Sequence, residues 1–342
     1  MAETQKAKPK KSTTLRKRVD AFLSRRPHRS FRRTQARDYH RSLKLPGFFV
    51  FTKSVAKTLW QNKKLFALLT LVYALLSGLI VGIASQDTYT AITDGLSEAS
   101  TTLGSDPGQL SIVAGLIATA LTGGLNQTLT QAQSTYATLL VLMAWLTTVW
   151  LLRNVLAGNK VKLRDGLYNA SAPILSTFLV TLVLILQLLP MAVAFIGYSA
   201  ASASGLLAGG IEAMLFWVAA GLLVVLSLYW VTSTLIALVI VTLPGMYPMK
   251  ALSTAGDIAV GRRVRLLLRL LWLIGTIVVA WIVVMVPLVL LNAWINSLWL
   301  AFSGVPLLPI ALVIMSSLTV VWSSSYVYLL YRKVVADDAK PA

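Results

Sequence analysis

Six apolar runs, of 21 to 30 residues each, constrain the fold of this chain more than any other feature. The hydrocarbon core of a bilayer is about 30 Å thick and an α-helix rises about 1.5 Å per residue, so about 20 apolar residues span it. None of the runs contains an internal Asp or Glu. The runs are Leu65–Ser85, Tyr136–Leu156, Ala172–Ile196, Met214–Leu243, Leu267–Leu291 and Leu307–Tyr331.

Each run is expected to form a helix, because unpaired backbone polar groups are unfavourable in lipid. Segments of about ten residues with alternating polarity, which are typical of membrane barrels, do not occur in the sequence. Only 13% of the residues are charged, against about 25% in soluble chains. We therefore predict an all-α fold, a polytopic transmembrane bundle of six spans, and exclude a water-soluble enzyme.

The distribution of Lys and Arg predicts the orientation of the spans. Connections after spans two and four are basic, whereas connections after spans one, three and five contain no Lys or Arg. Cytoplasmic loops are enriched in these residues, so we predict that both termini are cytoplasmic and that the protein lies in the inner (plasma) membrane of the cell. The basic residues are Arg153, Lys160, Lys162 and Arg164 in the first connection, Lys250, Arg262, Arg263, Arg265 and Arg269 in the second, and Arg332 and Lys333 after the last span.

The chain divides into an arm, an interfacial helix, a membrane domain and a tail. Residues 1–45 are too polar and basic to bury a core, which predicts a disordered cytoplasmic arm. Residues 46–64 carry apolar side chains at three- and four-residue steps, which predicts an amphipathic helix in the cytoplasmic interface. These side chains are Phe48, Phe51, Val55 and Leu59. The six-span domain follows at 65–332, and residues 333–342 form a cytoplasmic tail.

A 50-residue loop, 86–135, separates the first two spans and is predicted to be extracytoplasmic. It contains the short apolar segment Ser111–Leu125, which Gly and Thr dilute. As a seventh span, this segment would place every later basic connection outside, against the charge distribution. We therefore predict an interfacial or re-entrant helix here, and the sequence leaves open whether the loop packs as a cap or is mobile.

The second basic connection resembles a known family. AL at 251–252, then GRRVR at 261–265 leading into LLLRLLWL, is similar to a segment that precedes a span in six-helix bacterial integral membrane proteins. That group includes the membrane domain attached to some glycerophosphoryl diester phosphodiesterases. The run HRSFRRTQARDYHRSLKLPGFFVFTKSVAKTLWQNKKLF also resembles the start of an uncharacterised multi-pass family. The catalytic domain of the phosphodiesterases is absent, so the resemblance implies a membrane module without the hydrolase.

The sequence contains little that points to catalysis or cofactor binding. It has no Cys, and its two His residues lie in the basic arm without a carboxylate at metal-ligand spacing. It also lacks the P-loop, the nucleophile elbow and the zinc-protease motif. We therefore expect a non-enzymatic protein with no catalytic residue, no metal and no cofactor.

The basic connections indicate membrane lipid, and anionic lipid in particular, as the ligand. A Lys or Arg near an anionic membrane surface contributes about 1 kcal/mol. The candidate headgroup-binding residues are Lys160, Lys162, Arg164, Arg262, Arg263 and Arg265. Gly78 and Gly82 form a G-x-x-x-G pattern and are candidates for helix packing, including a dimer face. We predict a protein that binds or organises anionic lipid or partner proteins at the inner leaflet.

Two alternative functions stay open. A permease-like transporter of a small solute or lipid would use polar residues inside the spans, such as Gln187 and Thr232, although no span carries the buried acid of a proton relay. A membrane assembly factor would contact ribosomes through the basic arm. Aromatic residues are sparse in that arm and it has no RNA-binding motif, so nucleic acid is not the expected partner. A protein partner or a second copy of the chain is compatible with the sequence.

Overall fold

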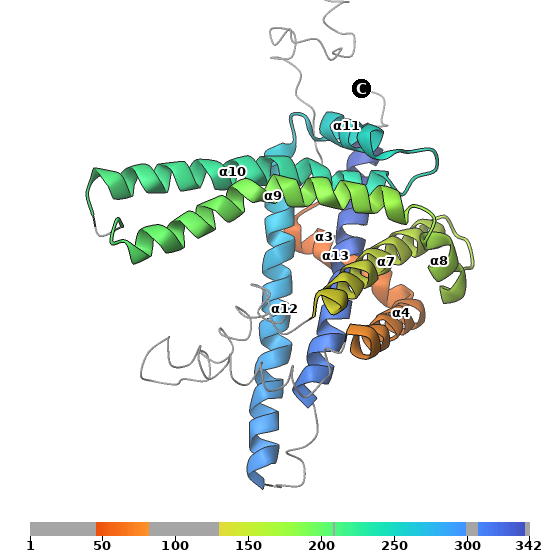
Figure 1. Cartoon of the computed structure of the whole chain (residues 1–342). Coiled ribbons are helices and arrows are strands. Elements are labelled where there is room, and N and C mark those ends of the chain that lie inside the picture. The colour runs from red at the N-terminus through yellow and green to blue at the C-terminus, as the bar shows by residue number, and fades with distance from the viewer. Residues whose placement is uncertain (1–45, 82–129, 208, 299–306, 339–342) are drawn as a thin grey trace, which may run out of the picture. The chain divides into compact units, whose positions relative to one another are not determined.

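The computed structural model describes residues 46–81, 130–207, 209–298 and 307–338. Within these ranges the chain forms helices joined by turns, and no residue is in a strand. Six helices are long and apolar enough to cross a membrane, which confirms the predicted fold class (Figure 1). The spanning segments are Lys63–Val81, Gln131–Leu156, Ile174–Ala203, Ile211–Ile240, Arg263–Met285 and Leu307–Ala336.

Several predicted features lie outside the described residues. They are the basic arm 1–45, the loop as far as residue 129 with the segment Ser111–Leu125, Gly82, and residues 339–342 of the tail.

A corner at Asn62 joins the first two helices, α3 (Phe48–Gln61) and α4 (Lys63–Leu76). Asn62 has non-helical backbone angles, φ −113° and ψ 31°, and its side-chain amide donates to the Thr58 carbonyl oxygen at 3.1 Å. Helix α3 is amphipathic, since Phe51 and Val55 are buried while its two lysines are exposed. The first span continues from α4 into a π-helical turn at Ser77–Val81.

Helix α7 (Gln131–Leu156) begins five residues before the apolar run that predicted it. A capping box explains the earlier start. The Gln133 amide donates to Thr130 Oγ1 at 3.3 Å, and the Thr130 amide donates to Gln133 Oε1 at 2.8 Å. Residues 131–135 of the predicted loop 86–135 therefore belong to the start of α7. Polar capping residues lie outside an apolar run, so hydropathy alone cannot place the start of a helix.

The remaining helices are two short ones in the basic connections and four long ones. They are α8 (Leu163–Ala170), α9 (Ile174–Ala203), α10 (Ile211–Ile240), α11 (Pro248–Ala259), α12 (Arg263–Leu298) and α13 (Leu307–Asp338). Helices α9 and α10 run side by side as a hairpin (Figure 1). Helix α13 contacts α3, α4, α7, α10 and α12, so it is the element around which the core is built.

Two polar contacts join α9 to α10. Pro190 lies inside α9, and the next amide, that of Met191, donates to Ser227 Oγ of α10 at 3.0 Å. The Thr234 hydroxyl donates to Gln187 Oε1 at 2.6 Å. Polar side chains inside these two spans therefore satisfy one another and the backbone, as hydroxyl and amide groups in membrane helices commonly do.

Candidate functional site

The corner between α3 and α4 and the turn between α7 and α8 line one cavity of about 500 Å³. Lys63 and Lys64 reach it from the start of α4, and Lys160 reaches it from the turn after α7. The lining contains no Asp or Glu. We call it the basic cavity, defined by Gln61, Asn62, Lys63, Lys64, Asn159 and Lys160. Three ammonium groups and the Gln61 side-chain amide provide it with hydrogen-bond donors suited to an oxyanion. The side-chain amides of Asn62 and Asn159 already donate to the Thr58 carbonyl oxygen and to Asn154 Oδ1.

Local backbone geometry places these side chains. Because α4 begins directly after Asn62, both of its lysines lie in the first helical turn, which contains no acidic residue. The N-terminus of a helix carries a positive partial charge, so the backbone adds to the charge of the lysines. On the other side of the cavity, Gly158 lies two residues after the end of α7 and has φ +85°. The backbone amide of Asn159 then donates to the Asn154 carbonyl oxygen at 3.1 Å. This glycine turn directs the chain toward Lys160.

Only Lys160, among the six predicted headgroup-binding residues, lines the basic cavity. Lys162 and Arg164 lie close by in sequence and are exposed at the start of α8. The backbone amide of Lys162 donates to Asp165 Oδ2 at 3.1 Å, and this hydrogen bond caps the start of α8. The Lys162 residue is exposed.

The other three predicted residues lie at the junction of α11 and α12. Arg262 is only 3% exposed, so its guanidinium is held within the protein. Arg263 donates to the Tyr229 carbonyl oxygen at 3.1 Å and stacks 4.0 Å from the centroid of the Tyr229 ring. Arg265 is exposed. None of these three arginines lines the basic cavity, so the structure does not join the two basic connections into one site.

Sequence reasoning missed Lys63 and Lys64 as site residues. The signal was present, because Lys63 and Lys64 open the first span and Lys160 follows the second. Consecutive spans run in opposite directions, so the start of the first and the end of the second lie at the same membrane surface. Two adjacent helices then bring the three lysines together.

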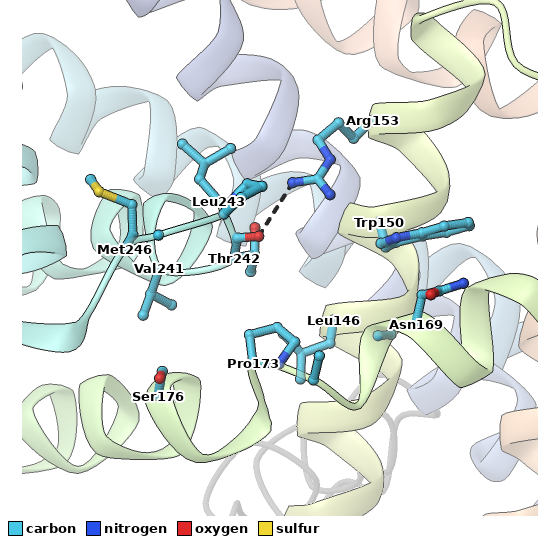
Figure 2. A pocket seen from close by; sticks show the side chains of 14 residues that line it. Leu146, Trp150, Arg153, Asn169, Pro173, Ser176, Val241, Thr242, Leu243 and Met246 are labelled. Atoms are coloured by element: carbon cyan, nitrogen blue, oxygen red, sulfur yellow. Dashed lines mark hydrogen bonds between the residues drawn. The ribbon is translucent and has the colours of Figure 1, made fainter.

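A separate cavity of about 410 Å³ lies where the ends of α7 and α10 meet the start of α9 (Figure 2). Arg153 Nη1 donates to the Thr242 carbonyl oxygen at 3.3 Å. Thr242 lies two residues after Ile240, the last residue of α10, so Arg153 provides a hydrogen-bond donor to the turn that follows this helix. Figure 2 shows this guanidinium turned toward Thr242, with Pro173 and Ser176 on the opposite side of the cavity. The cation that lines this cavity therefore has a structural partner.

The glycine pair predicted for helix packing is described only at Gly78. A Cβ at Gly78 would meet no atom of the described chain within 4 Å. The close approach occurs instead at Gly166 of α8, where a Cβ would lie 2.8 Å from Leu151 Cδ2 and 3.3 Å from Thr147 Cγ2 of α7. Gly166 therefore permits α8 to pack directly on α7.

Six helices that are long and apolar enough to cross a membrane define the chain as a multi-pass helical membrane protein. No protein-family model, curated protein or solved structure matches it. Within the described ranges, no group of three His, Cys, Asp or Glu side chains is placed to hold a metal ion.

Proposed function

We propose that this chain is a non-enzymatic membrane protein that binds the headgroup of an anionic lipid in the basic cavity, at the inner leaflet. One observation carries the proposal: Lys63, Lys64 and Lys160 line a single cavity whose lining contains no carboxylate. Neighbouring ammonium groups without a neutralising acid attract an anion, and anionic lipid is the anion that a membrane surface supplies. In this proposal the chain acts as a membrane module, which its resemblance to six-helix bacterial membrane proteins also implies.

Native mass spectrometry of the full chain tests the proposal. The protein is extracted gently from vesicles that contain equal amounts of phosphatidylglycerol and phosphatidylcholine, and the retained lipids are identified. We expect the wild-type chain to retain phosphatidylglycerol preferentially. Replacing Lys63, Lys64 and Lys160 together by Gln removes the preference, since each lysine near the surface contributes about 1 kcal/mol, or about fivefold in affinity.

A matched control separates the cavity from diffuse surface charge. Lys53→Gln, Lys57→Gln and Lys250→Gln together remove the same charge from exposed lysines that do not line the basic cavity. This variant is expected to keep the preference for phosphatidylglycerol. Equal loss in both variants, or a wild-type chain that retains the two lipids equally, contradicts binding in the basic cavity.

A further inference from the structure

An apolar groove adjoins the basic cavity and shares Lys63 with it. The groove has a volume of about 460 Å³ and lies between α3, α4, α12 and α13. We call it the tryptophan groove, defined by Trp60, Lys63, Phe66, Ala280, Trp281 and Trp322. The Lys63 ammonium lies 5.2 Å from the centroid of the Trp60 ring, so a cation marks the point where the groove meets the basic cavity.

Three polar side chains along the groove, those of Thr70, Thr276 and Trp281, are engaged within the protein. The Thr70 hydroxyl donates to the Phe66 carbonyl oxygen at 2.9 Å, one turn earlier in α4. The Trp281 ring N–H donates to Thr319 Oγ1 at 2.9 Å, and the Thr276 hydroxyl donates to the Leu273 carbonyl oxygen at 2.8 Å. With these groups paired, the walls of the groove are suited to hydrocarbon.

The length of the groove suits one chain of a lipid. Along α4 the lining runs from Lys63 to Thr70, a rise of about 10 Å. One leaflet contributes about 15 Å of hydrocarbon, half of a core about 30 Å thick. Three of the four helices that line the groove belong to membrane spans, so acyl chains are the surrounding solvent. A short apolar groove that begins at a lysine matches an anionic amphiphile in polarity, and its length accommodates the part of one acyl chain nearest to the headgroup.

We propose that one acyl chain of the bound anionic lipid lies in the tryptophan groove while its headgroup phosphate lies in the basic cavity. This inference rests on the proposed function and deepens it, because it specifies a glycerophospholipid held at both ends. An acyl chain gains little by leaving the bilayer for an apolar groove, since lipid tails are as apolar as the groove walls. The lysines therefore provide the preference for an anionic headgroup, and the groove determines where the chain lies.

Photocrosslinking of labelled lipids tests the position of the chain. The full-length protein is placed in phosphatidylcholine vesicles that contain a trace of phosphatidylglycerol with a diazirine on one acyl chain. Phosphatidylcholine with the same labelled chain serves as the neutral comparison, and a diazirine fatty acid tests a free anionic chain as the source. We expect the phosphatidylglycerol probe to label peptides that contain Trp281 and Trp322 several-fold more than either other probe does. The variant that lacks Lys63, Lys64 and Lys160 should lose this difference.

Filling the groove provides the decisive variant. Ala280 lines the groove, and Ala280→Phe places a ring within it. We expect labelling of the groove peptides to fall several-fold. Ala67→Phe, from α4 on the other wall, is the second filling variant if the first fails to fold. Ala219→Phe, at an exposed position of α10 outside the groove, is the matched control and should label as the wild type does.

The outcomes separate this inference from the proposed function. Preferential retention of phosphatidylglycerol together with groove labelling that is equal for all probes, or that survives both filling variants, overturns the groove inference alone. If the labelled chain never reaches the groove, the groove inference alone is also overturned, and a protein segment is favoured as the occupant of the groove. A fatty acid that labels the groove as strongly as phosphatidylglycerol overturns the requirement for a glycerophospholipid. Failure of the native mass spectrometry preference overturns the proposed function itself.

Discussion

The guanidinium of Arg269, in the second turn of α12, donates a hydrogen bond to the carbonyl oxygen of Pro46, which lies just before α3. The same guanidinium lies 4.3 Å from the centroid of the Phe48 ring and 5.6 Å from that of Phe51. Its side chain is only 6% exposed, so the carbonyl oxygen and the ring faces replace water as its partners. Arg269 therefore anchors the amphipathic helix α3 to the membrane domain.

Removing this anchor should loosen α3. The change Arg269→Ala deletes a charge-assisted hydrogen bond and the stacking on Phe48, a loss of about 1.5–3 kcal/mol. The chain has no Cys, so Val55→Cys introduces a unique thiol at a position that is 0% exposed in α3. We expect a maleimide reagent to modify this thiol slowly in the Arg269 protein and several-fold faster after Arg269→Ala.

A thiol on the exposed side of α3 provides the control for that experiment. Lys57 is exposed, so Lys57→Cys should react equally fast with and without Arg269. If the Val55 thiol reacts at the same rate in both backgrounds, Arg269 does not hold α3 in place.

Close packing at Gly166 predicts a large effect from a small substitution. Gly166→Ala brings a methyl group to 2.8 Å from Leu151 Cδ2, so either α8 or the Leu151 side chain must shift. We expect the free energy of unfolding to fall by about 1–3 kcal/mol, measured by thermal unfolding in detergent. Gly256→Ala in α11 meets no atom within 4 Å and should be close to neutral. Unchanged stability after Gly166→Ala would mean that α8 does not pack on α7 as closely as described.

The contact between Gln187 and Thr234 distinguishes helix packing from solute transport. A double-mutant cycle with Gln187→Leu and Thr234→Val should give a coupling free energy near 0.6 kcal/mol, the average for hydrogen bonds between membrane helices. Thr232→Val is the comparison, since that hydroxyl donates within its own helix to the Leu228 carbonyl oxygen at 2.6 Å. Absence of coupling, combined with altered solute uptake by Gln187→Leu, would favour a permease.

The proposed orientation makes a direct prediction for single-thiol variants in intact cells. Lys160→Cys and Ile258→Cys lie in the two basic connections and should resist a membrane-impermeant maleimide until the membrane is opened. Glu212→Cys, at the exposed start of α10, should react in intact cells. Reaction of the thiol at position 160 or 258 from outside would reverse the orientation and remove the basic cavity from the inner leaflet.

Local sequence patterns predict the helices of this chain better than they predict its site. The length of an apolar run and the steps between Phe51, Val55 and Leu59 describe properties within a single helix, so they can be read without knowing its neighbours. The early start of α7 was missed because the Thr130 and Gln133 capping box is polar. Gly166 was missed because a single glycine in a short helix gives no local sign of the Leu151 side chain that it faces.

By itself the sequence determined that the chain has six helices long and apolar enough to cross a membrane. A backbone in lipid must form its own hydrogen bonds, and an apolar run of sufficient length does so as a helix. Only the tertiary structure brings Lys63 and Lys64 to the same cavity as Lys160 and buries Arg262. These outcomes depend on which side chains of separate spans interlock, and no periodicity within one span encodes the partner that it will meet.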